Sequence, residues 1–133
     1  MNWSKGADVT PEELYYSQEH EWVRMDDDIA TIGITDYAQE QLGDIVYVDL
    51  PTMGESIEAG AVVGELESTK SVSEIFAPIA GEIVRVNETL EANPEQVNAD
   101  AFGEGWLFAV RPNDDDPTSA LMSAEAYVAF VNE

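Results

Sequence analysis

The sequence feature that most restricts the fold is a pair of β-type segments separated by a short polar tract. Apolar residues around Val62 and Leu66 lead into the tract, and an alternating run follows it at residues 72–75. The tract itself, residues 67–71, has the sequence Glu-Ser-Thr-Lys-Ser. Two strand-like runs joined by a few polar residues predict a β-hairpin. We expect Lys70 to stand at its tip, pointing away from the sheet.

Lysine is rare in this chain, which contains only Lys5 and Lys70. The position of Lys70 therefore does not reflect a surface rich in lysine. A Schiff-base nucleophile would need burial or a neighbouring cation, whereas the residues near Lys70 include Glu65, Glu67 and Glu74. We interpret Lys70 as a carrier lysine that an external enzyme loads covalently with a cofactor.

The length and composition indicate a single soluble domain. A chain of 133 residues has room for one hydrophobic core. No run of about 18 apolar residues predicts a transmembrane helix. The N-terminus has neither the pattern of a secretory signal nor that of a transit peptide, so we expect a cytoplasmic protein. The absence of cysteine excludes disulfides, thiolate metal sites and a cysteine nucleophile.

The charge is strongly negative, with 28 acidic against 5 basic residues. Such a field repels nucleic acids and anionic membranes, which need Lys or Arg to release counterions. One interpretation is a solvated acidic surface, suited to a salt-rich cytoplasm that screens self-repulsion. The other is steering toward basic docking faces on partner enzymes. We favour the first for most of the acids, because they are spread along the whole chain.

Outside the central hairpin, short strand-like runs dominate, and we expect short helices between them. The segment 36–42 predicts a helix that Asp36 caps and Gly43 closes. A second helix is predicted to begin at Pro117 with Asp116 as its cap, and a third follows Ser123. Residues 88–98 are polar and irregular. The predicted strands, besides the central hairpin, are 14–17, 21–25, 29–34, 44–50, 82–87 and 107–111.

An internal repeat indicates how these strands are arranged. Residues 43–49 and 81–87 share the pattern Gly-acid-Ile-Val-x-Val-Asp/Asn. Two related β-units of this size predict two facing antiparallel sheets with pseudo-twofold symmetry and a shared core. The expected fold is therefore mainly β, a sandwich or flattened barrel with short peripheral helices, one of them C-terminal. We expect residues 1–13 to form a loosely ordered leader and residues 14–133 the single domain.

Several kinds of catalytic site lack the residues they require. Serine catalysis needs a histidine base, and the single histidine, His20, has no identifiable triad. One histidine without cysteine also argues against a zinc site. The aspartate runs 26–28 and 114–116 lack the ligand spacing of a calcium loop, so we expect solvated turns. We therefore predict no catalytic residue, no metal site and no autonomous enzyme activity.

The tract around Lys70, followed by Glu74-Ile75 and Pro78-Ile79-Ala80-Gly81, resembles the attachment segment of lipoyl and biotinyl carrier domains. Thr69 and Ser71 beside the lysine look lipoyl-like, since biotin carriers usually have methionines there. Further stretches resemble the glycine cleavage system H protein family. They are residues 17–23, residues 30–39 continuing through Leu42-Gly43-Asp44, residues 103–107 and residues 121–127.

This resemblance implies a fold like that of lipoyl domains and a shuttle role. Lys70 would carry lipoate as an amide, within a motif formed by Glu67, Ser68, Thr69, Ser71 and Glu74. The arm would collect an aminomethyl group at glycine decarboxylase, a pyridoxal-phosphate enzyme, and deliver it to a tetrahydrofolate-dependent aminomethyltransferase. Dihydrolipoyl dehydrogenase would reoxidise the arm. A lipoate ligase or a lipoyl/octanoyl transferase would attach it.

The resemblance also implies a surface cleft that shelters the loaded arm. Carried over residue by residue, the cleft would include Glu21, Glu74 and Gln41, although some family members have histidine at the position of Gln41. An acidic cleft suits a cationic aminomethyl group. For Glu21, an exposed strand acid with no such role is an equally weighted alternative. His20 is expected to be structural and to contact the adjacent sheet.

Two other functions fit the attachment motif. The first is an acyl-carrying lipoyl domain of a 2-oxoacid dehydrogenase, but such modules are shorter and lack the C-terminal helical segment. The second is a lipoate depot that donates its lipoyl group to other proteins. The motif alone does not separate these roles from that of a glycine cleavage carrier.

Overall fold

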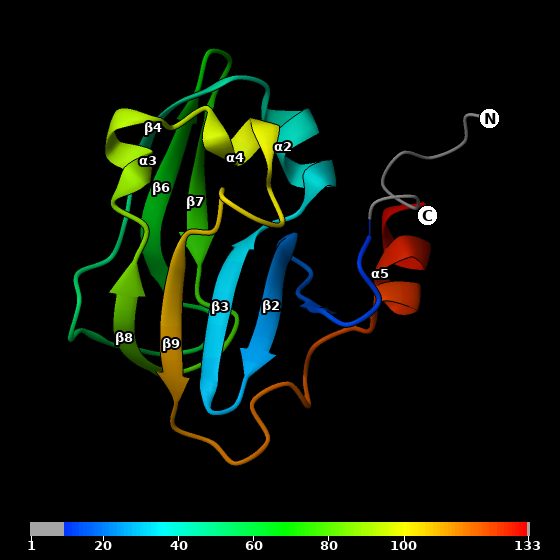
Figure 1. Ribbon diagram of the computed structural model, residues 1–133. Helices are drawn as coiled ribbons and strands as arrows, with labels where there is room; N and C mark the ends of the chain where they lie inside the picture. The colour runs from blue at the N-terminus through cyan, green and yellow to red at the C-terminus, as the bar shows by residue number, and fades with distance from the viewer. Residues whose placement is uncertain (1–9, 133) are drawn as a thin grey trace.

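The computed structural model describes residues 10–132, which form two antiparallel sheets with short helices around them (Figure 1). The six-stranded sheet contains, in spatial order, β1 (Tyr15–Tyr16), β2 (Glu21–Asp26), β3 (Ile29–Ile34), β9 (Phe108–Pro112), β8 (Gly81–Val86) and β5 (Ser56–Ile57). The three-stranded sheet contains β4 (Ile45–Asp49), β6 (Val62–Ser68) and β7 (Val72–Phe76), with β6 in the centre. The predicted mainly β architecture of two antiparallel sheets is confirmed.

One hydrophobic core lies between the two sheets. The six-stranded sheet contributes Ile32 and Phe108, and the three-stranded sheet contributes Leu66 and Ile75, all of them buried. Side chains alternate between the two faces of a strand, so these four residues lie on the faces that the two sheets turn toward each other. The repeated segments, 43–49 and 81–87, contribute strands to different sheets. The pseudo-twofold relation between them stays a prediction.

The helices are short, and their starts differ in part from the prediction. They are α2 (Asp36–Leu42), α3 (Thr89–Ala92), α4 (Gln96–Ala99) and α5 (Ala124–Val131). The cap of α2 is Thr35, whose hydroxyl accepts a hydrogen bond from the backbone N–H of Ala38. The prediction of Asp36 as the cap was therefore wrong by one residue. Ser123 caps α5, as predicted, by accepting from the N–H of Ala126.

Two predictions for the irregular segments were wrong. No helix begins at Pro117, because residues 116–121 form successive turns instead. The segment 88–98, expected to be irregular, contains α3 and most of α4, each only one turn long. Pro94 lies between them, where the missing backbone N–H interrupts a continuous helix.

A second, smaller core attaches α5 to the edge of the six-stranded sheet. Tyr16 of β1 stacks on Tyr127 of α5 with ring centroids 4.8 Å apart. The backbones of Tyr16 and Met122 exchange two hydrogen bonds, of 2.8 and 2.7 Å. Of the predicted leader, residues 1–9 lie outside the described part of the chain. Within residues 10–132, no helix is both long and apolar enough to cross a membrane.

Candidate lipoyl attachment site

Lys70 lies exposed in the turn between β6 and β7, as the sequence predicted. The turn is closed by Ser68, whose hydroxyl accepts hydrogen bonds from the backbone N–H groups of Lys70 at 3.1 Å and Ser71 at 3.0 Å. The N–H of Ser68 donates in turn to the carbonyl of Ser71. These bonds fix the backbone of the turn while the lysine side chain stays accessible.

The end of α2 supports the hairpin tip from the side, and both stand at the same end of the molecule (Figure 1). The backbone N–H of Thr69 donates to the carbonyl of Asp44 at 3.0 Å. Gly43 ends α2 with a φ of 86°, as predicted, although its ψ of −162° lies outside the left-handed helical region. A Cβ atom at Gly43 would lie 3.2 Å from Cε of Lys70. The glycine therefore leaves room for the lysine stem against the helix end.

Glu21 is only 2% exposed, so the alternative of an exposed strand acid was wrong. Its carboxylate accepts hydrogen bonds from the Ser17 hydroxyl and from the backbone N–H of Phe76, both at 2.9 Å. Burial raises the pKa of Glu21 to about 8, even though both hydrogen bonds act in the opposite direction. At neutral pH this group is therefore mostly protonated, and it joins β2 to the end of β7.

Two pockets adjoin the β1–β2 loop, one toward the end of β7 and residues 120–121, the other toward α2. The first, of about 350 Å³, is lined by Glu21, Phe76 and Leu121 among others. The second, of about 330 Å³, is lined by His20, Tyr37, Ala38, Gln41, Leu42 and Ser73. Glu19 lines both pockets. The structure therefore puts Glu21 and Gln41 in neighbouring pockets that share one exposed carboxylate.

Glu74 does not join Glu21 and Gln41. It is exposed and pairs with Glu65 across the hairpin, whereas the next residue, Ile75, is buried. Because side chains alternate along a strand, Glu74 lies on the outer face of the three-stranded sheet. Glu67 is also exposed there, opposite Val72. The three residues implied for the cleft thus do not line one pocket.

His20 has a structural environment, as expected, but its partner is a helix and not the adjacent sheet. Its Nδ1 atom lies 2.9 Å from the Tyr127 hydroxyl of α5. The same hydroxyl lies 2.7 Å from Oγ1 of Thr35, the cap of α2. Burial lowers the pKa of His20, which favours a neutral ring. This network connects the C-terminal helix with the helix that supports Lys70.

Glu19, Tyr37 and Ser73 line the pockets but were not selected from the sequence. Glu19 precedes the His-Glu-Trp motif, and this adjacency was the only signal for it. Ser73 lies three residues beyond Lys70 and pairs with the buried Leu66, a register that only the folded hairpin defines. In residues 10–132, no group of three or more His, Cys, Asp or Glu side chains is arranged to hold a metal ion.

Comparisons with known proteins agree with this geometry. Residues 14–133 match the family model described as glycine cleavage H-protein. A glycine cleavage system H protein of Bacteroides thetaiotaomicron is 57% identical over 92% of this chain and 97% of its own length. One of Anaeromyxobacter sp. (strain K) is 50% identical over 92% of this chain and 96% of its own.

A solved structure is similar to this chain in both fold and sequence. The crystal structure of a glycine cleavage system H protein from Mycobacterium marinum superposes with a TM-score of 0.86 at 37% identity. The match covers 92% of this chain and 99% of the other. The sequence motifs, the exposed lysine on its hairpin and these relatives lead to one conclusion: the chain belongs to the glycine cleavage H-protein family.

Proposed function

We propose that this protein is the lipoyl carrier of the glycine cleavage system and that Lys70 is its attachment site. The observation that carries the proposal is an exposed lysine at the tip of a hydrogen-bonded hairpin, in a chain 57% identical to a glycine cleavage system H protein. The surroundings fit an attached arm, because Gly43 leaves space for the lysine stem and two pockets open nearby.

Lipoate, joined to Lys70 as an amide, would supply a disulfide that accepts and releases the aminomethyl group of glycine. The chain itself fixes the backbone of the turn through Ser68 and leaves Lys70 exposed. Such tethering contributes reach and effective concentration, not bond-making. The protein is therefore a non-catalytic component, and glycine decarboxylase, aminomethyltransferase and dihydrolipoyl dehydrogenase are its proposed partners.

The two pockets that adjoin the β1–β2 loop are the proposed shelter for the loaded arm. Glu19 carries an exposed carboxylate shared by both pockets, which suits a cationic aminomethyl group. Gln41 contributes an uncharged amide. Glu21, mostly protonated at neutral pH, contributes hydrogen bonding and shape more than charge. Glu67 and Glu74, exposed beside the hairpin tip, remain available to the enzyme that attaches lipoate, a ligase or a lipoyl/octanoyl transferase.

Intact mass spectrometry tests the attachment site. Incubation with lipoate, ATP and a lipoate ligase should add one lipoyl group to the wild-type protein and none to Lys70→Arg. The matched control is Lys5→Arg, which alters the only other lysine and should be modified like the wild type. Modification of Lys70→Arg, or an unmodified wild type, would contradict the proposal.

Reconstitution tests the role of the loaded protein. Lipoylated protein mixed with glycine decarboxylase should support exchange of carbon between glycine and bicarbonate. Absence of exchange, together with transfer of the lipoyl group to other proteins, would favour the lipoate depot. An acyl carrier of a 2-oxoacid dehydrogenase is not favoured, because the family match extends through α5. A cytoplasmic location stays a prediction.

A further inference from the structure

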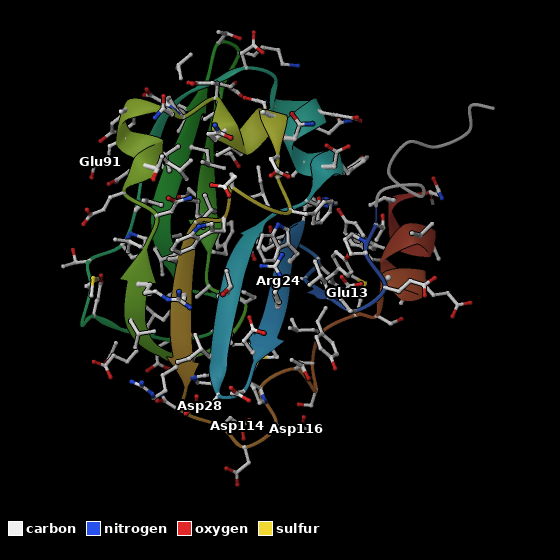
Figure 2. The ribbon with its side chains drawn as sticks, in the orientation of Figure 1. Glu13, Arg24, Asp28, Glu91, Asp114 and Asp116 are labelled. Carbon is white, nitrogen blue, oxygen red and sulfur yellow. The ribbon has the colours of Figure 1, made fainter. Side chains whose placement is uncertain are left out.

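Two arginines converge on the face of the six-stranded sheet that points away from the core. Arg24 pairs with Thr31, Thr31 with Ala109, and Ala109 with Arg85, so the four residues form one row across β2, β3, β9 and β8. Cross-strand partners point to the same face. The core residue Ile32 follows Thr31 on β3 and faces the other way. Figure 2 shows Arg24 over this sheet, on the side nearest the viewer.

Three residues of this row, Arg24, Thr31 and Arg85, line a pocket of about 230 Å³. Thr31 and Ala109 are small and buried in the middle of the row, and the arginines stand at its two ends. Strands are about 4.8 Å apart, so the Cα atoms of Arg24 and Arg85 are separated by about 14 Å. That span accommodates one small ligand between two long side chains. We name this site the arginine pocket; it is lined by Arg24, Asp26, Thr31, Arg85 and Trp106.

Both guanidinium groups are held by aromatic rings. Arg24 lies 4.8 Å from the centroid of the Trp22 ring, and Arg85 lies 5.9 Å from that of Trp106. Arg24 also donates from Nη2 to the carbonyl of Phe102 at 2.6 Å. A guanidinium has five N–H donors, so these contacts orient the groups and leave most donors for a ligand. Pre-oriented side chains lose less conformational freedom on binding.

The charge of the pocket is opposite to that of the rest of the protein. The chain has 28 acidic and 5 basic residues, and two of those five line this single pocket. Within residues 10–132, no ion pair joins Arg24 or Arg85 to a carboxylate. Asp26 lines the pocket without forming such a pair, which leaves a local charge of about +1.

We propose that the arginine pocket binds a phosphate group, as free phosphate or as the end of a small phosphate ester. Guanidinium groups bind phosphate through charge-assisted, often bidentate hydrogen bonds. A tetrahedral dianion can accept from arginines on two sides, whereas a single carboxylate can be satisfied by one. The site lies on a different sheet from Lys70, so it is independent of the proposed carrier function.

Titration at constant ionic strength, followed by tryptophan fluorescence and by NMR of the arginine Nε–H groups, tests this proposal. Near 0.15 M KCl the Debye length is about 8 Å, so distant acids are screened more than direct contacts. Inorganic phosphate should bind, and glycerol phosphate distinguishes esters from the free ion. Succinate, a dicarboxylate of similar charge, should bind at least about fivefold more weakly.

Variants separate the pocket from general charge effects. Arg24→Gln and Arg85→Gln should each weaken phosphate binding by about tenfold or more, and Asp26→Asn should strengthen it about threefold. Arg111→Gln is the matched control, because Arg111 lies on β9 outside the pocket and should change the affinity less than twofold. Circular dichroism checks the fold of each variant.

Three results would overturn the proposal. The first is no binding of either phosphate compound at 20 mM (about a hundredfold above a typical metabolite KM). The second is an affinity that stays unchanged in folded Arg24→Gln and Arg85→Gln. The third is tighter binding of succinate than of phosphate. Binding by Lys70→Arg equal to that of the wild type would support a site separate from lipoyl attachment.

Discussion

The carboxylate of Glu21 accepts a hydrogen bond from the backbone N–H of Phe76 at 2.9 Å, which connects strands of the two different sheets. Glu21 lies at the start of β2 and Phe76 at the end of β7. This bond ties the strand that leads away from the Lys70 turn to the larger sheet. Because Glu21 is a buried acid, the stability of the fold should depend on pH.

Replacing Glu21 by Gln should remove that dependence. The folded pKa is about 8 against an ordinary value of 4.5, so between these values the folded state binds the proton and the unfolded state does not. Stability from this group is therefore complete below about pH 4.5 and falls as pH rises to 8, by about 5 kcal/mol at most. Urea unfolding from pH 5 to 9 should show this fall in the wild type and not in Glu21→Gln. The same slope in both would contradict the assignment. Glu91→Gln, which alters an exposed acid on α3, should keep the wild-type slope.

Replacing Gly43 by Ala should destabilise the end of α2 by about 1 kcal/mol, because alanine is strained at a positive φ. Gly54→Ala is the matched control, since its φ of 89° is similar and nothing lies within 4 Å of an added Cβ. Denaturant unfolding should give nearly equal losses, because the Lys70 stem near Gly43 is flexible and can move aside. Gly43→Ala could instead lose much more unfolding free energy than the control, as overpacking causes in a core. That result would indicate a rigidly packed lysine.

Replacing Tyr127 by Phe should cost about 1–3 kcal/mol of unfolding free energy. The Tyr127 hydroxyl lies within hydrogen-bond distance of both His20 and Thr35. Its loss leaves the partly buried His20 and the buried Thr35 without that partner. Thermal and urea unfolding measure the effect. Tyr15→Phe is the control, because Tyr15 is exposed. That substitution should change stability by no more than about 0.5 kcal/mol, as is usual at the surface. Equal effects of the two substitutions would argue against the network.

Added salt should stabilise the fold. The formal net charge of −23 makes the compact state repel itself, and screening shortens the range of that repulsion to about 3 Å in 1 M salt. The melting temperature should rise by several degrees between about 0.05 and 1 M KCl, and NaCl should act similarly because screening depends on ionic strength. A melting temperature that stays flat over this range would contradict the prediction.

Local sequence patterns were sufficient to predict the structural features that depend on residues close together in the chain. The polar tract between two alternating runs predicted the hairpin with Lys70 exposed in its turn, and Ser123 predicted the start of α5. Each of these depends on interactions within a few residues, such as the Ser123 hydroxyl with the N–H of Ala126. Where two adjacent residues can both cap a helix, the pattern can select the wrong one: it predicted Asp36, and the cap is Thr35.

The cleft residues show where the sequence was insufficient. Glu21 and Glu74 are both acids in strands, and nothing local distinguishes the buried one, bonded to Phe76, from the exposed one opposite Glu65. The row that brings Arg24 and Arg85 together depends on three strand pairings, one of which joins segments far apart in the chain.

The sequence by itself therefore determined the β-hairpin, its exposed lysine and the acidic charge, since these follow from near neighbours and composition. Only the tertiary structure decided which charged side chains are buried, paired or gathered in pockets, because sheet order and register are set by packing between distant segments.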